Sequence, residues 1–333
     1  MKVIIPILLN ALLSLSSTEA KDMIRRNTRA EEGSGEPEVA DIINGTPTGK
    51  ALPYQVGLSR DPKSKPSCGG SLIAPRVVLT VAHCYMDDFG ELKEPVLRTV
   101  QVNMYDASNI YEPGLIMMNL SSGKIGQDIF PHPNYNPTKP FPATREYDIA
   151  LVILPFAVEG DNIKYAKLNK DRNVPVYDER LYISGWGDTE DGSQSDILLG
   201  TVVNYVPDDE CAARYDVQGS LFGMMCAYEE GTGVWFGDSG GPLVIAAQDE
   251  AAPANEPPLQ VGIVSWGRGC ATPGYPQVYT RVSHYFDWIT STACEAVGEL
   301  CPSAKSGTSS KALKSKASKS KASKSQRPSS MSA

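Results

Sequence analysis

The sequence predicts an all-β fold, and three observations lead to this prediction. Short runs rich in β-branched and apolar residues recur between turn residues, at positions 71–73, 77–81, 96–102, 149–154, 181–184, 243–246, 259–266 and 278–282. The chain contains 29 Gly and 25 Pro, which suits many short strands joined by turns. Regular helical periodicity is scarce before residues 283–290, where a C-terminal helix is expected. The pattern favours an all-β architecture over a parallel α/β one.

The N-terminal 41 residues differ in composition from this β-rich body. Residues 1–20 begin with Lys2, continue as a short apolar run and end on small residues at Ala20, which is typical of a signal peptide. The alternative is a membrane anchor, but the run is shorter than the roughly 20 apolar residues that span a bilayer. The polar residues 21–41 are interpreted as a pro-segment. We therefore expect a secreted protein, without a membrane span, whose folded domain covers residues 42–302.

Charge separates the body of the chain from its C-terminal tail. The net charge is −8, but residues 303–333 hold seven Lys, one Arg and no acid, so they carry +8 and residues 1–302 carry −16. An acidic body argues against a nucleic-acid partner. The tail, rich in Ser, Lys and Ala, has too little apolar surface to offset its ordering entropy, so we expect it to be disordered. Its charge predicts binding to anionic surfaces, with a merely solubilising role as the alternative.

The segment at residues 237–242 (GDSGGP) is the first sign of chemistry. A serine hydroxyl is a weak nucleophile at neutral pH, so Ser239 needs a base that takes its proton and donors that hold an oxyanion. Glycines beside the serine let backbone N–H groups approach a substrate carbonyl. A glycine-rich turn between strands is the alternative interpretation.

The chain offers three histidines as the base, His83, His132 and His284. His83 follows a strand-like run in the segment LTVAHC, whereas His132 lies between two prolines and His284 lies in the expected helix. Asp148 stands at the head of an apolar run in YDIAL, and a buried aspartate needs hydrogen-bond partners. Such a carboxylate orients a histidine and stabilises its protonated form. The predicted catalytic triad is His83, Asp148 and Ser239.

These motifs, in the order His, Asp, Ser, resemble the chymotrypsin/trypsin family of serine proteases. Four further segments support the resemblance: IINGT at 42–46, SGWG at 184–187, SWG at 265–267 and VYTRV at 278–282. The resemblance covers residues 42–290 and implies two six-stranded antiparallel β-barrels packed together, with a C-terminal helix. It implies that the amides of Gly237 and Ser239 form the oxyanion hole, and that Ser265 hydrogen-bonds Asp148. We expect no cofactor and no metal in the catalytic site, and the sequence leaves calcium binding elsewhere open.

The resemblance also bears on the seven cysteines and on activation. It implies two family disulfides, Cys68–Cys84 and Cys211–Cys226. The family partner of Cys270 falls on Trp235, so Cys270 is expected to be unpaired and Cys294–Cys301 to form a third bond; a bond from Cys270 to either of those two is the alternative. The resemblance further implies a zymogen that is cleaved before Ile42, whose new amino group pairs with Asp238. The preceding Asp41 departs from the basic residue usual at that site.

The resemblance to the family also implies a specificity pocket. Its expected residues are Gly233, Val234, Ser265, Trp266, Gly267 and Gln277. Gly233 stands where trypsin-like members carry Asp, and segments 231–237 and 262–286 contain no acid. An unpaired buried Lys or Arg is strongly unfavourable, so we expect cleavage after uncharged residues. The alternative is a shift that brings Glu230 into the pocket, and the choice between large and small side chains stays open.

The predicted function is that of a secreted serine endopeptidase, which hydrolyses protein or peptide substrates through an acyl-enzyme and is open to proteinaceous inhibitors. One alternative is a non-catalytic homologue acting as a binding or inhibitory module, and another gives the basic tail the main role. Sequons at Asn44 and Asn119 predict a glycoprotein. Residues 249–258, rich in Ala, Pro and acid, are interpreted as an exposed insertion between two strands.

Overall fold

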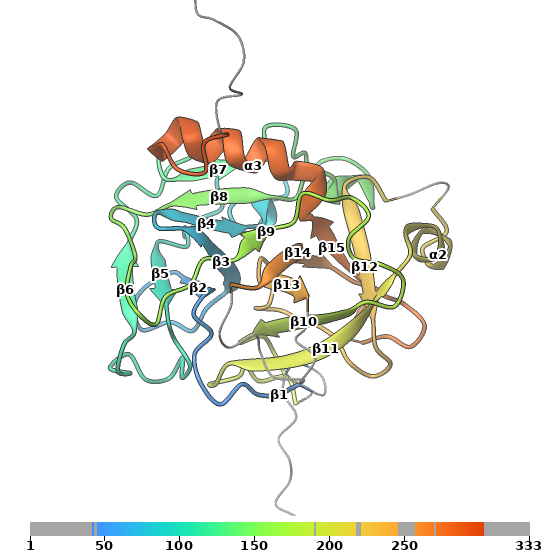
Figure 1. Cartoon of the computed structure of the whole chain (residues 1–333), viewed down its shortest axis with the longest axis horizontal. Coiled ribbons are helices and arrows are strands. Elements are labelled where there is room, and N and C mark those ends of the chain that lie inside the picture. The colour runs from blue at the N-terminus through green and yellow to red at the C-terminus, as the bar shows by residue number, and fades with distance from the viewer. Residues whose placement is uncertain are drawn as a thin grey trace, which may run out of the picture. The chain divides into compact units, whose positions relative to one another are not determined.

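The computed structural model describes residues 42, 45–189, 191–217, 221–245, 257–269 and 271–302. The described residues up to Cys301 form two β-sheets with a long helix against them (Figure 1). The first sheet has the order β6-β5-β2-β3-β4-β8-β7. Its strands are β2 (Gln55–Ser59), β3 (Cys68–Ala74), β4 (Val77–Thr80), β5 (Thr99–Val102), β6 (Ile116–Asn119), β7 (Ile129–Pro131) and β8 (Ala150–Ile153).

The second sheet contains a closed barrel of six strands. The order is β11-β10-β13-β14-β15-β12, and β11 pairs with β12 to close the ring. Two short strands lie outside the ring, β1 antiparallel to β11 and β9 parallel to β14. The strands are β1 (Thr46–Pro47), β9 (Lys167–Leu168), β10 (Arg180–Gly185), β11 (Leu199–Val206), β12 (Met224–Tyr228), β13 (Pro242–Ile245), β14 (Leu259–Trp266) and β15 (Gln277–Arg281).

The all-β prediction with a C-terminal helix is confirmed, with one difference in the first half. There the sheet curls without closing, because no ladder joins β6 to β7 among the described strands. The loop between them is held by a carboxylate instead. Asp128 accepts hydrogen bonds from the amide of Gly123, at 2.6 Å, and from the hydroxyl of Ser122, at 2.8 Å. These donors are thus satisfied by a side chain within the loop and not by a neighbouring strand.

Helix α3 (Val282–Val297) is longer than residues 283–290, the span that the sequence predicts. Tyr285, Ile289 and Ala293 are buried and recur at four-residue spacing, so one face stays apolar past the predicted end. The helix stops at Gly298, which adopts a left-handed φ of 73°. A short helix, α2 (Asp208–Arg214), and two 3-10 turns, η1 (Ala82–Cys84) and η2 (Ala143–Arg145), complete the list. In the described part of the chain, no helix has the length and apolar character needed to cross a membrane.

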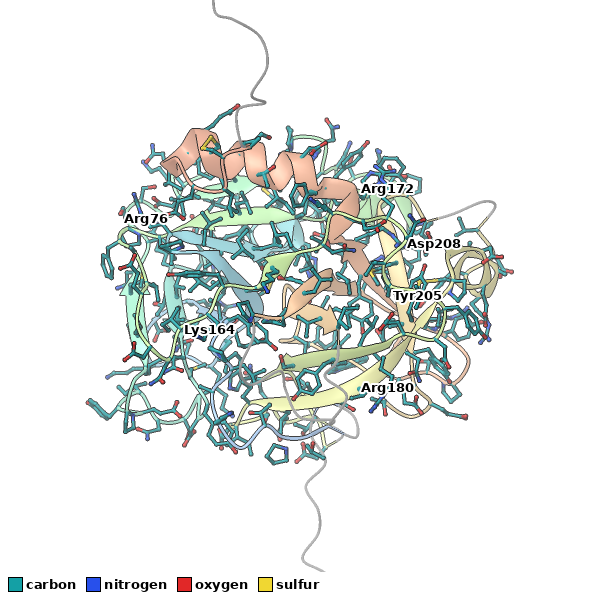
Figure 2. The ribbon with its side chains drawn as sticks, viewed as in Figure 1. Arg76, Lys164, Arg172, Arg180, Tyr205 and Asp208 are labelled. Carbon is teal, nitrogen blue, oxygen red and sulfur yellow. A yellow bond between two sulfur atoms is a disulfide. The ribbon has the colours of Figure 1, made fainter. Side chains whose placement is uncertain are left out.

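A buried arginine anchors the start of α3. Arg281 Nε donates to the carbonyl of Met224 at 3.1 Å, and its Nη2 donates to the carboxylate of Asp208. The same carboxylate accepts the Tyr205 hydroxyl at 3.1 Å, and Figure 2 shows these two side chains beside the second barrel. The charge of the buried guanidinium is therefore compensated, as burial of a charge requires.

Polar side chains join the two sheets in the interior. The carboxamide of Gln55 donates to the Ser184 carbonyl at 3.2 Å and accepts the Ser184 hydroxyl at 2.9 Å. Ser71 donates to the Gln260 side chain at 2.7 Å. All four residues are buried, so each bond satisfies groups that water cannot reach. These links fix the position of the first sheet against the barrel along the line where the candidate site lies.

Candidate active site

Strand pairing brings His83 and Asp148 together. β4 and β8 are antiparallel, with Thr80 opposite Ala150. His83 lies in η1, just after β4, and Asp148 lies just before β8, so both fall beyond the same edge of the pair. The Cys68–Cys84 disulfide ties η1 back to β3.

The contacts of Asp148 hold the histidine ring in one orientation. The aspartate is fully buried, and its Oδ2 lies 2.7 Å from His83 Nδ1. Its Oδ1 accepts the backbone amide of His83 at 2.9 Å, and Oδ2 also accepts the Ser265 hydroxyl at 2.6 Å. With Nδ1 engaged, Nε2 is the ring nitrogen that is left to exchange a proton with another group.

The surroundings also keep Asp148 ionised. Burial of this carboxyl by itself raises its pKa, but the His83 ring, through charge and hydrogen bonding, together with Arg145 and Ser265, outweighs burial. The net pKa of Asp148 therefore lies below its usual value. A carboxylate in this state can stabilise a protonated imidazole beside it.

Ser239 lies in the turn between β12 and β13. Gly237 has a φ of 100°, and a Cβ there would lie 2.9 Å from the Cα of Gly187, so the turn requires glycine at this position. The Ser239 carbonyl accepts the amide of Gly69 in β3 at 2.8 Å, which fixes the turn against the first sheet.

The backbone amides and the hydroxyl around Ser239 lack the hydrogen bonds that catalysis would use, within the described residues. Neither the Gly237 amide nor the Ser239 amide donates a hydrogen bond there, and no hydrogen bond joins the Ser239 hydroxyl to His83. Catalytic hydrogen bonds are often long without substrate and tighten in the substrate complex.

A cleft of about 780 Å³ holds both His83 and Ser239. Its apolar wall includes Trp266, against which the ring of Phe141 packs edge-on at 4.6 Å. Four charged side chains that the sequence analysis did not single out also line the cleft: Arg60, Lys93, Glu94 and Arg145. No motif marks them, although Arg145 could have been suspected because it lies three residues before Asp148.

The predicted pocket residues are only partly together. Val234, Ser265, Trp266, Gly267 and Gln277 line the cleft. Gly233 does not; a Cβ on it would be 3.3 Å from both the backbone of Ala271 and Gln277 Nε2. Glu230 is exposed and is not among the lining residues, so the structure gives no support to the alternative that placed it in the pocket.

Asp238 and Ile42 are both buried in the second half of the domain. Asp238 accepts the amide of Gly187 at 2.9 Å and that of Trp235 at 3.0 Å. Burial, together with the nearby charge of Asp188, raises the pKa of this carboxyl to about 7 although the two amides lower it. Ile42 packs in the core of the barrel with Leu181 and other apolar residues.

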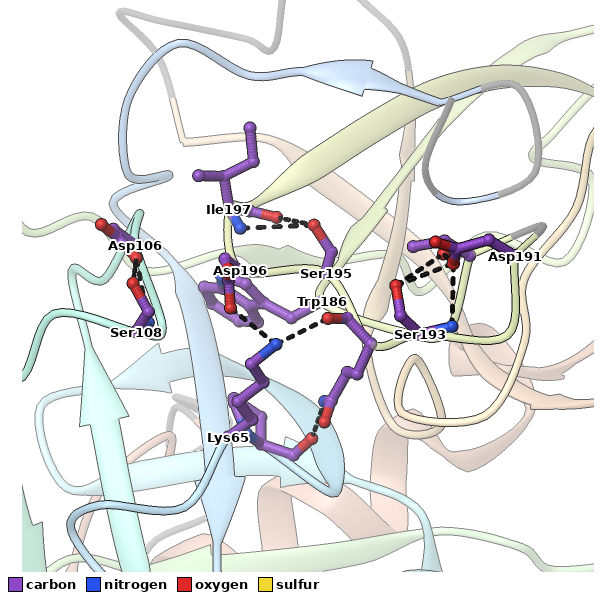
Figure 3. Close-up of polar contacts among 12 residues, drawn as sticks. Lys65, Asp106, Ser108, Trp186, Asp191, Ser193, Ser195, Asp196 and Ile197 are labelled. Carbon is purple, nitrogen blue, oxygen red and sulfur yellow. Dashed lines mark hydrogen bonds and ion pairs between the residues drawn. The ribbon is translucent and has the colours of Figure 1, made fainter. Parts of the chain in front are cut away.

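A polar clamp joins the loop between β10 and β11 to the segment before β3 (Figure 3). Lys65 Nζ donates to the Gln194 carbonyl at 2.6 Å and lies 2.6 Å from the Asp196 carboxylate. The Gln194 side chain donates to the Pro66 carbonyl at 2.5 Å, and its Nε2 would lie 3.4 Å from a Cβ on Gly237. Sequence analysis missed this contact because its two halves lie about 130 residues apart.

The three expected disulfides, Cys68–Cys84, Cys211–Cys226 and Cys294–Cys301, are present. Cys270, Asn44 and most of the 249–258 segment lie outside the described residues, as do residues 1–41 and 303–333. Asn119 is described, and its side-chain oxygen accepts the Thr99 hydroxyl at 2.8 Å.

Comparison with known proteins agrees with this arrangement. The family model described as Trypsin matches residues 42–289. Hypodermin-A of Hypoderma lineatum is 34% identical over 73% of this chain and 83% of its own length. Trypsin beta of Drosophila erecta is 31% identical over 76% of this chain and 88% of its own length.

A human relative, transmembrane protease serine 5, is 32% identical over 81% of this chain, which spans 55% of the length of that protein. The matched residues contain both sheets and the cleft between them. The chain therefore belongs to the trypsin family of serine proteases.

Proposed function

We propose that the chain is a secreted serine endopeptidase that cleaves peptide bonds with His83, Asp148 and Ser239. One observation carries the proposal: the fully buried Asp148 carboxylate lies 2.7 Å from His83 Nδ1, in a cleft that Ser239 also lines. A buried carboxylate that orients a histidine beside a serine turn is the arrangement that acyl transfer needs.

The proposed reaction has two halves. His83 Nε2 takes the Ser239 proton while Oγ attacks the substrate carbonyl carbon, and the protonated ring then gives that proton to the leaving amine as the C–N bond breaks. Water attacks the resulting ester, again giving its proton to His83, and the acid is released as Ser239 regains a proton. The unpartnered amides of Gly237 and Ser239 would hold the oxyanion.

Activation is proposed to depend on Asp238. Cleavage after Asp41 would free the amino group of Ile42, and an ammonium beside the buried Asp238 carboxylate would supply the cation that it lacks. Burial of an ammonium is favourable only when it is paired, so the pair would order the turn that carries Gly237. N-terminal sequencing of the active protein tests this step. A chain that is fully active with residues 21–41 attached would refute it.

Poor cleavage after Lys and Arg is part of the proposal. The cleft wall formed by the second barrel, from Val234 to Gln277, contributes no acid, so a cationic side chain there would be buried without a counter-charge. A cleavage profile on a peptide library tests this statement, and a profile dominated by Lys and Arg would overturn it.

A labelled fluorophosphonate tests the proposed activity most directly. This probe reacts with an activated serine hydroxyl, so wild-type protein whose chain begins at Ile42 should be labelled, while the Ser239→Ala variant with the same N-terminus should not. The exposed Ser291, replaced by alanine, serves as the control and should leave labelling unchanged. If wild-type protein is not labelled at any pH between about 6 and 9, the conclusion is that Ser239 is not activated.

That negative outcome would favour a second candidate, a non-catalytic homologue that acts as a binding or inhibitory module. The observation on its side is that no hydrogen bond joins Ser239 to His83 in the described residues. The outcome of labelling decides between the two.

Secretion and the tail complete the proposal. We assign residues 1–20 to a signal peptide, 21–41 to a pro-segment and 303–333 to a basic tail that binds anionic surfaces. The protease domain, residues 42–302, would carry a glycan on Asn119, which is exposed, and on Asn44. Retention on an anionic resin at low salt tests the tail, because removal of residues 303–333 should weaken retention and leave peptide turnover unchanged.

A further inference from the structure

The side chain of Gln277 occupies an unusual place in the cleft. Gln277 is the first residue of β15, it is 4% exposed, and it lines the cleft together with Gly267 and Trp266. Its backbone register is set by pairing with Ala227 in β12. Strand pairing in the barrel therefore fixes the backbone of Gln277, while its side chain contributes to the lining of the cleft.

Two glycines enclose the carboxamide. A Cβ on Gly267 would overlap Gln277 Oε1, and a Cβ on Gly233 would lie 3.3 Å from Gln277 Nε2. Gly267 and Gly233 are separated by 34 positions in the chain, so they contribute separate walls. The Gln277 carboxamide lies between those walls, and Gly233, which also abuts the backbone of Ala271, does not line the cleft.

The carboxamide is poorly satisfied by its own neighbours. Its one hydrogen bond within the described residues runs from Nε2 to the Gly269 carbonyl, and at 3.5 Å it is long. A carboxamide can donate two hydrogen bonds and accept two. Oε1 and the second N–H are thus left for a polar group that enters the cleft.

We propose that Gln277 closes the base of the specificity pocket, so that the enzyme selects short, uncharged side chains before the scissile bond, namely Ala, Ser and Thr. This inference rests on the proposed peptidase function. A long aromatic or aliphatic side chain would have to displace the carboxamide from between its two glycine walls. A Ser or Thr hydroxyl would instead donate to Gln277 Oε1 and complete its hydrogen bonding.

Substrate profiles of pocket variants test the proposal. Wild-type protein should cleave best after Ala, Ser and Thr, whereas Gln277→Gly should raise kcat/KM after Phe, Tyr and Leu by roughly tenfold or more. If the Gln277→Gly substitution destabilises strand β15, the variant Gln277→Ala provides the same test. Gln127→Gly, at an exposed loop position, is the matched control and should keep the wild-type profile. A wild-type protein that already prefers Phe or Tyr would overturn the proposal.

The isosteric variant Gln277→Met separates shape from hydrogen bonding. It should keep the preference for short side chains, because methionine fills a similar volume. It should lose the advantage of Ser over Ala, by about two- to tenfold, because the acceptor is gone. An unchanged preference for Ser would refute the role of Oε1.

A binding experiment keeps the inference testable even if the chain is not a peptidase. In a Ser239→Ala background, 5-fluoroindole observed by fluorine NMR should bind the Gln277→Gly double variant and should not bind the single variant. Equal binding to both variants would refute the proposal that Gln277 closes the pocket, whatever the catalytic result. Binding to the double variant alone, with no fluorophosphonate labelling of wild-type protein, would reject the proposed function and leave the closed pocket standing.

Discussion

The two halves of the domain contribute to the cleft in different ways. The first sheet supplies His83 and Asp148, which are locked by hydrogen bonds of 2.7 and 2.9 Å and backed by Ser265 from the barrel. The barrel supplies Ser239 on a turn that also carries Asp238, a buried carboxylate that accepts two backbone amides. The proposed base and its carboxylate are thus already hydrogen-bonded in this structure, whereas Asp238, beside the proposed nucleophile, has no cationic partner among the described residues. The comparison suggests that regulation acts on the barrel.

The largest expected effect concerns the proposed triad. His83→Ala and Ser239→Ala should each lower kcat by about 10⁴-fold or more, and should leave the melting temperature within a few degrees of wild type. His284→Ala is the matched histidine control, since His284 packs on Phe222 away from the cleft, and it should retain activity. Measurement of kcat on a peptide substrate checks the prediction. Near-normal turnover by either variant would contradict the proposed triad.

The next prediction concerns the barrel's contribution to the base. Ser265 donates to Asp148 Oδ2 at 2.6 Å, and a hydrogen bond to a charged group contributes about 1.5–3 kcal/mol. Ser265→Ala should therefore lower kcat by roughly tenfold. Loss of this donor removes one of the contacts that lower the pKa of Asp148, so kcat should fall across the whole pH–rate profile. A profile identical to that of wild type would show that the first sheet orients His83 alone.

Asp238 gives a prediction on stability for the uncut chain. Its pKa is raised from 3.8 to about 7, so the folded state holds the proton more tightly than the unfolded state. The resulting stabilisation is fully present below pH 3.8 and is lost as pH rises through 7. The melting temperature of Ser239→Ala protein that keeps residues 21–41 should therefore fall as the pH rises from 3.8 to about 7, in part because Asp238 loses its proton.

The variant Ser239→Ala/Asp238→Asn isolates that contribution, because asparagine does not titrate. Its melting temperature should decline less between pH 4 and pH 7 than that of Ser239→Ala alone. Identical declines would mean that the charge on Asp238 is already compensated in the uncut chain, which would remove the difference between the two halves.

The smallest effect is expected at the clamp between the halves. Lys65 and Asp196 are 33% and 60% exposed, and exposed ion pairs contribute about 0–1 kcal/mol. Lys65→Ala should lower kcat/KM less than about fivefold, and the loss should shrink at high salt. Lys63→Ala, two residues away and exposed, is the control. A loss of a hundredfold or more would show that the clamp positions Gly237.

Much of the fold and the chemistry could be predicted from local patterns. The segment 237–242 and the strand runs depend on residues whose types are restricted by nearby backbone geometry, whereas the disulfide pairings followed from the family resemblance. Gly237 is an example, since its φ of 100° and the neighbouring Gly187 exclude other residues. Strand β2, with its glycine and five buried residues, escaped prediction because no alternation of apolar and polar positions marks it.

The sequence by itself determined the fold class, the family and the candidates for base, carboxylate and nucleophile, because each of these rests on a short motif. Only the tertiary structure decided what fills the cleft. The carboxamide of Gln277 lies between Gly233 and Gly267 because β12, β14 and β15 are paired in a closed barrel. Where a side chain ends in such a cavity depends on the register of strands far apart in the chain, and no local pattern of residue types encodes that register.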